Sequence, residues 1–127
     1  MQTLDGDTLL FFNDHPGTLP LFAAVDKAIL DRYPAAQRRV QKTQITYYHR
    51  HVFACVSFAR VKRKADLPES WLTLTLGLPS PADSPRAAAQ TQVRPGRWTV
   101  HFVIGSAAEL DEELLDWLDR SYALSER

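Results

Sequence analysis

The 127-residue sequence has one cysteine, five glycines and no excess of charge of either sign, and these scarcities exclude several classes of protein. Cys55 has no second cysteine to pair with, so a disulfide-stapled fold is excluded. No apolar run approaches the ~18 residues that span a bilayer, so we expect no contact with the membrane interior. Asp5 and Asp7 stand where a secretory signal would carry bases, and we therefore expect a cytoplasmic protein.

Sequence motifs that would name a reaction are also missing. The chain contains no GxSxG, HExxH, GxxxxGK[ST], GxGxxG or DxDxDG pattern, so neither a cofactor nor a metal is predicted. With 45% hydrophobic residues, the chain is long enough to close one hydrophobic core, which we place at about residues 20–124 of a single domain spanning 1–127. The leading hypothesis is therefore a small binding or interaction module without catalytic activity of its own, whose protein or small-molecule partner is unknown.

Hydrophobic periodicity predicts an α+β fold. Apolar residues at helical spacing, followed by Pro34, indicate a helix over 20–33. The run Ser106–Glu109 fits a capping box that opens an acidic, amphipathic final helix. Between the helices, alternating or β-branched segments predict strands at 45–48, 53–61, 71–78 and 97–104. We expect an antiparallel four-stranded meander with the helices at the N- and C-terminal ends packed on one face.

Two segments have no clear period. Residues 9–12 are a short apolar run that we interpret as a strand or turn. Residues 79–96 contain four prolines, so we predict a long Pro-rich loop there, either a ligand or partner loop or an extension without a role.

The zero net charge conceals a strong segregation. Residues 38–64 hold eight bases and no acid, whereas 104–127 hold seven acids and two bases. Arg60, Lys62, Arg63 and Lys64 are candidate phosphate contacts for nucleic acid, next to aromatic residues that could stack on bases. This alternative is not favoured, because the chain as a whole is not basic and the acidic helix could neutralise the segment. The opposed charges also make a homodimer possible.

Titratable residues in the strands supply a second alternative, a small enzyme or ligand-binding domain. His101 is expected on the wetter side of its strand, and with Lys42 and Tyr47 it is a candidate ligand site. Cys55 paired with His101 would be a nucleophile and its base, although a buried, inert thiol is the commoner case. His49 and His51 have a spacing that suits a metal, but two ligands are too few for a zinc site.

The order of these features resembles a known family. LFAAVDKAIL, VQKTQITYYHRHVFACVSF, WLTLTLGL and RWTVHFVIGSAAELDEELLDWLDRSY are similar to segments of an uncharacterised family of small bacterial and archaeal domains of unknown function, of the DUF5655 type, sometimes labelled "predicted transport protein". The resemblance covers roughly residues 21–124 and implies one α+β domain with no established activity. It draws attention to five positions: Lys42, Phe53, His101, Asp111 and Tyr122.

Overall fold

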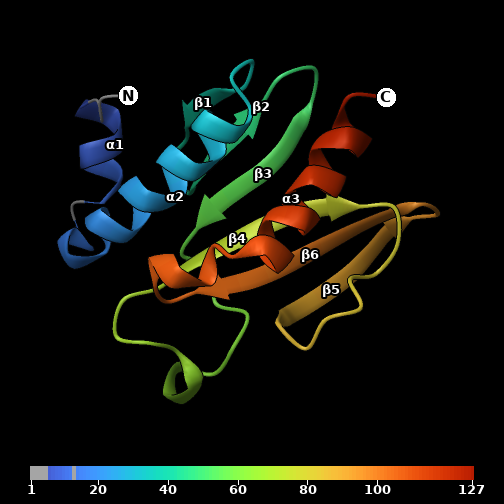
Figure 1. The fold of residues 1–127 in the computed structure, drawn as a ribbon. Coiled ribbons are helices and arrows are strands. Elements are labelled where there is room, and N and C mark those ends of the chain that lie inside the picture. The colour runs from blue at the N-terminus through green and yellow to red at the C-terminus, as the bar shows by residue number, and fades with distance from the viewer. Residues whose placement is uncertain (1–5, 13) are drawn as a thin grey trace.

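The computed structural model of the chain describes residues 6–12 and 14–127 (Figure 1). Short 3-10 helices lie at Pro16–Thr18 (η1), Lys64–Asp66 (η2) and Ala107–Glu109 (η3). The helices and strands are, in chain order, α1 (Gly6–Phe11), α2 (Leu19–Arg32), β1 (Gln37–Val40), β2 (Gln44–Tyr48), β3 (Val52–Ser57), β4 (Leu72–Leu78), β5 (Ala87–Arg94), β6 (Arg97–Ile104) and α3 (Glu112–Ser125).

The strands form one antiparallel sheet in the order β1-β2-β3-β4-β6-β5. The predicted α+β class with an antiparallel sheet is confirmed, but the prediction of four strands is wrong, because the sheet has six. The four predicted strands correspond to β2, β3, β4 and β6, and the two additional strands are the edges, β1 and β5.

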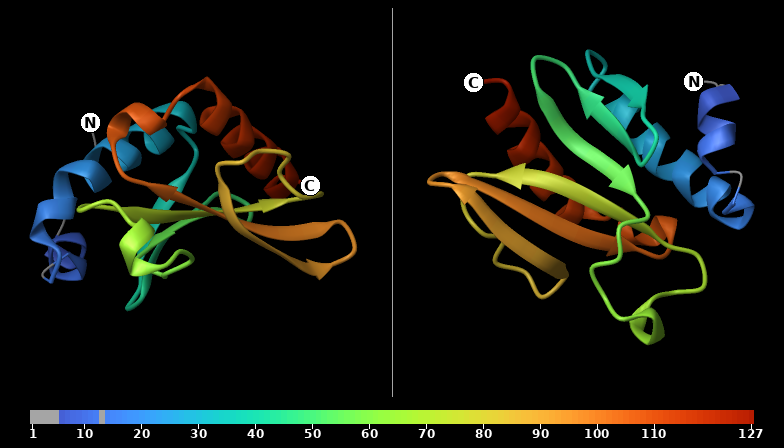
Figure 2. Two further views of the ribbon diagram at one scale, coloured as in Figure 1. Left: turned by 90° about the horizontal axis from the view of Figure 1, so that it is seen from below. Right: turned by 180° about the vertical axis from the view of Figure 1, so that it is seen from behind.

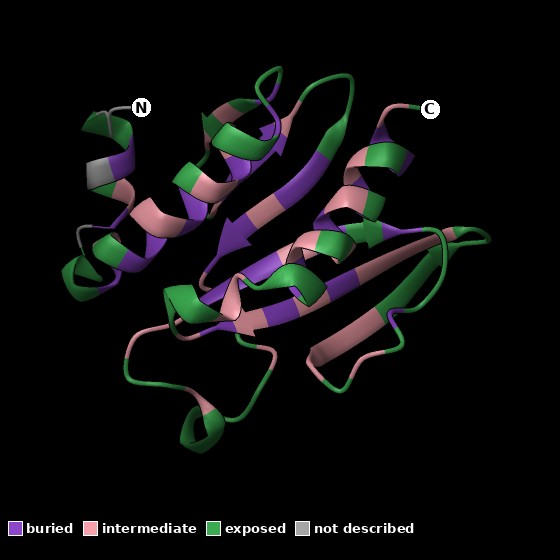
Figure 3. Cartoon of the chain, in the orientation of Figure 1, coloured by how far each residue is buried: buried purple, intermediate pink, exposed green. Residues whose placement is uncertain are grey.

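The two edge strands escaped prediction because little of their side-chain surface is apolar and buried. β1 has the sequence QRRV, which carries no alternation of apolar residues. β5 lies inside the predicted Pro-rich loop, has the sequence AAAQTQVR and contains no buried residue (Figure 3). Their pairing therefore rests on backbone hydrogen bonds to the neighbouring strand, which a hydrophobic pattern does not report.

Helices α2 and α3 lie on the same face of the sheet (Figure 2). The alternating leucines of β4 (Leu72, Leu74, Leu76 and Leu78) are each 1% exposed beneath the helices. Phe22 and Ile29 of α2 and Leu114 and Leu118 of α3 are fully buried against the strands. The core therefore fills the single layer between helices and sheet, and neither α2 nor α3 lies on the other face of the sheet.

Two local predictions near the helix ends are wrong. Residues 9–12 belong mainly to α1 rather than to a strand, and Phe12 follows that helix in a turn. Ser106 precedes η3 and makes no side-chain capping bond, while α3 begins later, where the Asp111 carboxylate accepts a hydrogen bond from Leu114 N at 3.1 Å. Within the described part of the chain, no helix combines the length and apolar character needed to cross a membrane.

Candidate functional site

The three candidate ligand residues lie in different places. Tyr47 is fully buried on the helix-covered side, where its hydroxyl donates to Asp26 Oδ1 at 2.8 Å. His101 is half-buried on the opposite face, with its Nδ1 2.8 Å from Thr75 Oγ1. Lys42 is exposed between β1 and β2. The sheet itself separates Tyr47 from His101, so the structure does not bring the three into one cavity.

Tyr47 belongs instead to a buried polar cluster that joins α2 to the sheet. Asp26, 2% exposed, binds Arg38 Nη1 through Oδ2 at 2.6 Å in addition to the Tyr47 hydroxyl. Burial, followed by the nearby Asp26 charge, raises the pKa of Tyr47 well above its ordinary value, so the phenol stays protonated and donates. The geometry is that of a satisfied core ion pair, which fixes α2 against β1 and β2.

Cys55 and His101 face away from the helices, in one row across the sheet. Thr75 pairs with Cys55 on one side and with His101 on the other, so the Cα atoms of Cys55 and His101 are two strand spacings apart, roughly 10 Å. Burial raises the pKa of the Cys55 thiol to about 11 and lowers the pKa of His101. At neutral pH both groups are uncharged, and the thiol donates to Gln44 Oε1 at 3.1 Å rather than to an imidazole.

The basic residues of the 38–64 segment separate into bound and unbound groups. Arg38 is held by Asp26, Arg63 contacts Asp66 Oδ2 at 3.0 Å, and Arg50 donates to the backbone oxygen of Glu126 at 3.0 Å. Arg60, Lys62 and Lys64 are exposed after β3 and form no ion pair with any described residue.

The acids of residues 104–127 pair mostly with bases outside the 38–64 segment. Asp119 binds Arg32 at 2.6 Å and Asp116 binds Arg120 at 3.0 Å. Only Glu126, through His49 and Arg50, meets the basic segment. The acidic helix therefore does not neutralise Arg60, Lys62 and Lys64.

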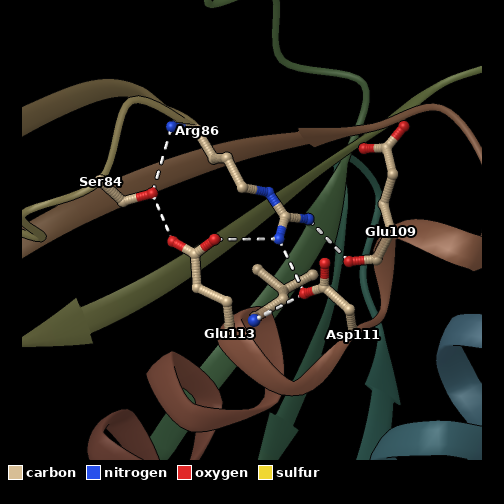
Figure 4. Close-up of polar contacts among 6 residues, drawn as sticks. Ser84, Arg86, Glu109, Asp111 and Glu113 are labelled. Carbon is tan, nitrogen blue, oxygen red and sulfur yellow. Dashed lines mark hydrogen bonds and ion pairs between the residues drawn. The ribbon is translucent and has the colours of Figure 1, made fainter.

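Arg86 holds the segment before β5 against the start of α3 (Figure 4). Its guanidinium donates to Asp111 Oδ1 and to the backbone oxygen of Glu109, both at 2.7 Å, and lies 3.4 Å from Glu113 Oε1. Ser84 completes the cluster by donating to Glu113 Oε2 at 2.6 Å. These contacts lower the pKa of Asp111, chiefly through Arg86, and the pKa of Glu113, chiefly through Ser84. The carboxylates are engaged with the protein itself, so this cluster is a structural clamp.

A cleft of about 420 Å³ is lined by residues of the β5–β6 hairpin, the start of β3 and the end of α3; we call it the hairpin cleft. Its cationic or titratable lining residues are His51, Arg94, Arg97 and Arg127, and no described aspartate or glutamate lines it. None of the three arginines forms an ion pair with a described residue.

Arg94 and Arg97 face each other across a tight turn. They are register partners in the β5–β6 pairing, with only Pro95 and Gly96 between them. Gly96 has φ 75°, a conformation that glycine adopts without steric cost and that follows proline readily in such turns. Like charges at directly opposite positions on paired strands are destabilising, so an anion that contacts both arginines would relieve their repulsion.

The wall of the hairpin cleft also exposes apolar surface. Val52 is 55% and Val93 67% exposed, and they are two of the three large hydrophobic residues classed as exposed in the described part of the chain. The partly buried Trp98 and the buried Leu124 continue this apolar wall. Exposed apolar side chains that gather at one concavity are typical of a binding site.

Two residues at the hairpin cleft donate hydrogen bonds to backbone oxygens at the C-terminal end of α3. His51 Nδ1 lies 2.7 Å from Ser125 O, and because a carbonyl oxygen only accepts, this nitrogen carries the proton. Arg50 binds the backbone oxygen of Glu126 as described above, so both residues offset the partial negative charge of the helix end. Arg94 and Arg97 make no such bond and stay available to a ligand.

The sequence contains a local signal for one wall of this site. Arg-Pro-Gly-Arg, residues 94–97, is a turn dipeptide flanked by two like charges, which predicts a hairpin with both arginines at its tip. The predicted loop at 79–96 and strand at 97–104 divide this motif between them and therefore do not include the pairing across the turn. The contribution of α3 and β3 to the cleft depends on tertiary packing and has no sequence signal.

The chain matches one protein family over most of its length. Residues 11–125 fit the family described as Domain of unknown function (DUF5655). No curated protein and no solved structure matches the chain. The matched range includes the sheet, α2 and all of α3, and with them every residue of the hairpin cleft except Arg127. The chain therefore belongs to the DUF5655 family, as the order of its sequence features had indicated.

Proposed function

We propose that this protein is a binding module that holds a small anionic ligand in the hairpin cleft. The observation that carries the proposal is the pair of arginines, Arg94 and Arg97, opposed across a two-residue turn, with no aspartate or glutamate among the described residues of the lining. A guanidinium group binds phosphate or carboxylate oxygens through two parallel hydrogen bonds, and two such groups can hold one anion between them.

The apolar wall supports a ligand that is larger than a simple ion. Val52 and Val93 are exposed at the cleft and Trp98 is partly so, which leaves apolar surface that folding has not covered. A volume of about 420 Å³ falls in the range of small-molecule sites, roughly 300–1,000 Å³.

The state of the titratable groups outside the cleft supports binding rather than catalysis. A nucleophilic cysteine needs a thiolate, and burial keeps the Cys55 thiol protonated at neutral pH, with a pKa of about 11. His101 and Cys55 are separated by the intervening strand β4, so neither activates the other.

Titration calorimetry with inorganic phosphate tests the proposal. We expect wild-type protein to bind phosphate and an Arg94→Gln/Arg97→Gln variant to bind at least 10-fold more weakly, because each arginine supplies charge-assisted hydrogen bonds. The control variant, Lys62→Gln/Lys64→Gln, also loses two positive charges, but at residues that do not line the cleft. It should bind phosphate as tightly as wild type does. Equal losses in both variants would show a non-specific charge effect and would contradict the proposal, as would the absence of phosphate binding by wild-type protein.

A second candidate function, binding of single-stranded nucleic acid, is favoured by the exposed bases Arg60, Lys62 and Lys64, which no described acid pairs with. If these residues contact phosphates, oligonucleotide affinity falls steeply with salt, and replacing all three by glutamine lowers the slope of log affinity against log salt by about 2. Fluorescence anisotropy at several salt concentrations measures this slope. No detectable binding at low ionic strength would rule the candidate out.

A further inference from the structure

The number of cations in the hairpin cleft bears on the charge of the ligand. Arg94 and Arg97 place two positive charges at the tip of the hairpin, and no aspartate or glutamate is among the described residues that line the cleft. A carboxylate would neutralise only one of the two opposed guanidinium groups. A phosphate monoester carries close to two negative charges at neutral pH and has enough oxygens for both arginines, so it matches the pair.

The shape of the rest of the cleft bears on what the phosphate is attached to. Trp98 follows Arg97 directly, lines the cleft and is only partly buried, so part of its indole is available for contact. Val52 and Val93 add apolar surface to the same wall. A planar ring packs well against such a wall, because aromatic faces combine large contact area with favourable stacking.

Polar groups within the same wall suit a ring with heteroatoms. Because Nδ1 of His51 is committed to Ser125 O, its Nε2 can accept a hydrogen bond, and no described residue supplies one. No described residue accepts a hydrogen bond from the indole N–H of Trp98. The hairpin cleft therefore offers one hydrogen-bond acceptor and one donor beside its apolar surface. A purely hydrocarbon ring would leave both of these polar groups unused.

From these observations we infer that the hairpin cleft takes a nucleoside monophosphate, with the phosphate between Arg94 and Arg97 and the base against Trp98. The inference rests on the proposed function and narrows it to one class of ligand. The same chemical group occurs in a free mononucleotide and at the 5′-phosphorylated end of a nucleic acid strand, so the test includes both.

Calorimetric titrations of wild-type protein with inorganic phosphate, ribose 5-phosphate, adenosine and AMP test the inference. We expect AMP to bind at least 10-fold more tightly than phosphate or ribose 5-phosphate, and adenosine to bind more weakly than AMP. Trp98→Leu should reduce AMP affinity to that of ribose 5-phosphate and leave phosphate binding unchanged. Since Trp98 also packs against the core, the indole N–H resonance of Trp98 in wild-type protein provides a second measurement, and AMP should shift it while phosphate alone does not.

The outcomes separate the inference from the proposed function. If phosphate binds through Arg94 and Arg97 but AMP binds no more tightly, or leaves the Trp98 indole resonance unmoved, the nucleotide inference is overturned while the anion site stands. If wild-type protein binds neither phosphate nor AMP, both are overturned. A 5′-phosphorylated dinucleotide that binds as tightly as AMP assigns the site to strand ends, and weaker binding assigns it to free nucleotides; either result supports the inference.

Discussion

Asp26 on α2 is held in the core by two contacts, an ion pair with Arg38 and a hydrogen bond from Tyr47. The side chains of Asp26 and Arg38 are only 3% and 9% exposed, so neither charge is well solvated by water. Removing one partner of a buried pair leaves the other charge without its counter-ion, which costs more than the pair itself contributes.

We expect Asp26→Leu to lower the free energy of unfolding by about 3 kcal/mol or more, because Arg38 loses its buried counter-ion. Replacing both partners, in Asp26→Leu/Arg38→Met, should recover part of that loss, since an apolar pair leaves no charge in the core while the buried Tyr47 hydroxyl stays without its acceptor. Urea unfolding followed by circular dichroism measures both variants. A free energy of unfolding for Asp26→Leu within about 1 kcal/mol of wild type would contradict the role given to this cluster, because a weak, exposed ion pair contributes that much.

Cys55 allows a second prediction for a single residue. With the pKa of its thiol raised by burial from 9.0 to about 11, the thiolate fraction at pH 7.5 is about 100-fold below that of an ordinary thiol. We expect iodoacetamide to modify Cys55 in the folded protein at least 100-fold more slowly than in urea-unfolded protein at the same pH. Mass spectrometry of the alkylated product measures the two rates, and comparable rates would indicate an accessible, ionised cysteine instead.

Single residues also mark the limit of prediction from the sequence. Alternation in strands places Ile45 and Tyr47 on one face and His101 on the face opposite Val100, and the structure has both arrangements. Alternation within each strand does not reveal how the two strands are related. Only the structure shows that Tyr47 of β2 faces α2 while His101 of β6 lies on the opposite side of the same sheet. That relation depends on strand order and register, which arise from packing over long sequence separations.

Among the secondary-structure elements, α2 and α3 are joined by one polar link at their edges. Asp119 of α3 accepts hydrogen bonds from Arg32 Nη2 at 2.6 Å and from the Tyr33 hydroxyl at 2.6 Å. These bonds, chiefly that from Arg32, lower the pKa of Asp119 below its ordinary value of 3.8. Tyr33 also stacks on Tyr122 with ring centroids 4.5 Å apart, so the link continues into apolar packing.

The lowered pKa of Asp119 sets the direction of a pH effect. Because the folded-state pKa lies below the unfolded one, the link stabilises the fold fully above the unfolded pKa, and the stabilisation is lost as the pH falls through the folded pKa. We expect Asp119→Asn to unfold at a lower temperature than wild type at pH 7, by an amount that shrinks in acid, as the pH falls below the ordinary carboxyl pKa of 3.8. The effect is modest, about 1 kcal/mol or less for the ion pair, because both side chains are over 40% exposed.

Thermal unfolding at neutral and at acid pH measures this difference, and Asp116→Asn is the matched control. Asp116 lies on the same helix and pairs with Arg120 one turn later, with both side chains 58% exposed, so its replacement should change stability by less than about 0.5 kcal/mol. A deficit of Asp119→Asn that persists unchanged at acid pH would show that the link does not act through its charge.

How well an element was predicted from the sequence followed from its burial. β4 and β6 alternate strongly because one side of each lies under the helices, and α2 begins and ends within one residue of its predicted bounds. β1 and β5 have few buried side chains, and the start of α3 was misplaced because Ser106 and Glu109 resemble a capping box while Asp111 provides the cap. The hairpin cleft escaped prediction for the same reason as β5, since one of its walls is that strand.

Across the molecule as a whole, acids and bases occupy different elements. None of the six strands contains an aspartate or glutamate, so every described acid lies on a helix or a connection. Arginines of β1, β5 and β6 are therefore the charged residues of the sheet. The segregation seen along the sequence persists in space, and only some of the bases are neutralised by internal pairs.

The acids of the C-terminal segment are largely satisfied inside the molecule, through Arg32, Arg86, Arg120 and His49. We therefore expect little electrostatic self-association and the same sedimentation coefficient at low and high salt. Analytical ultracentrifugation at about 20 mM and 500 mM salt, concentrations on either side of strong screening, makes the comparison. A larger species present only at low salt would show that opposite charges on two copies attract each other, as the sequence had made possible.

β5 has a further consequence for how the fold fluctuates. It contains no buried residue and pairs with β6 alone, so its amide hydrogens should exchange with solvent faster than those of β4, which is enclosed on both sides. The clamp at Arg86 anchors the start of β5 and the turn at Gly96 ends it, so we expect the strand to open as one local unit while the rest of the sheet stays intact. Each opening would carry Arg94 away from the cleft, and a bound ligand would therefore slow exchange specifically along β5.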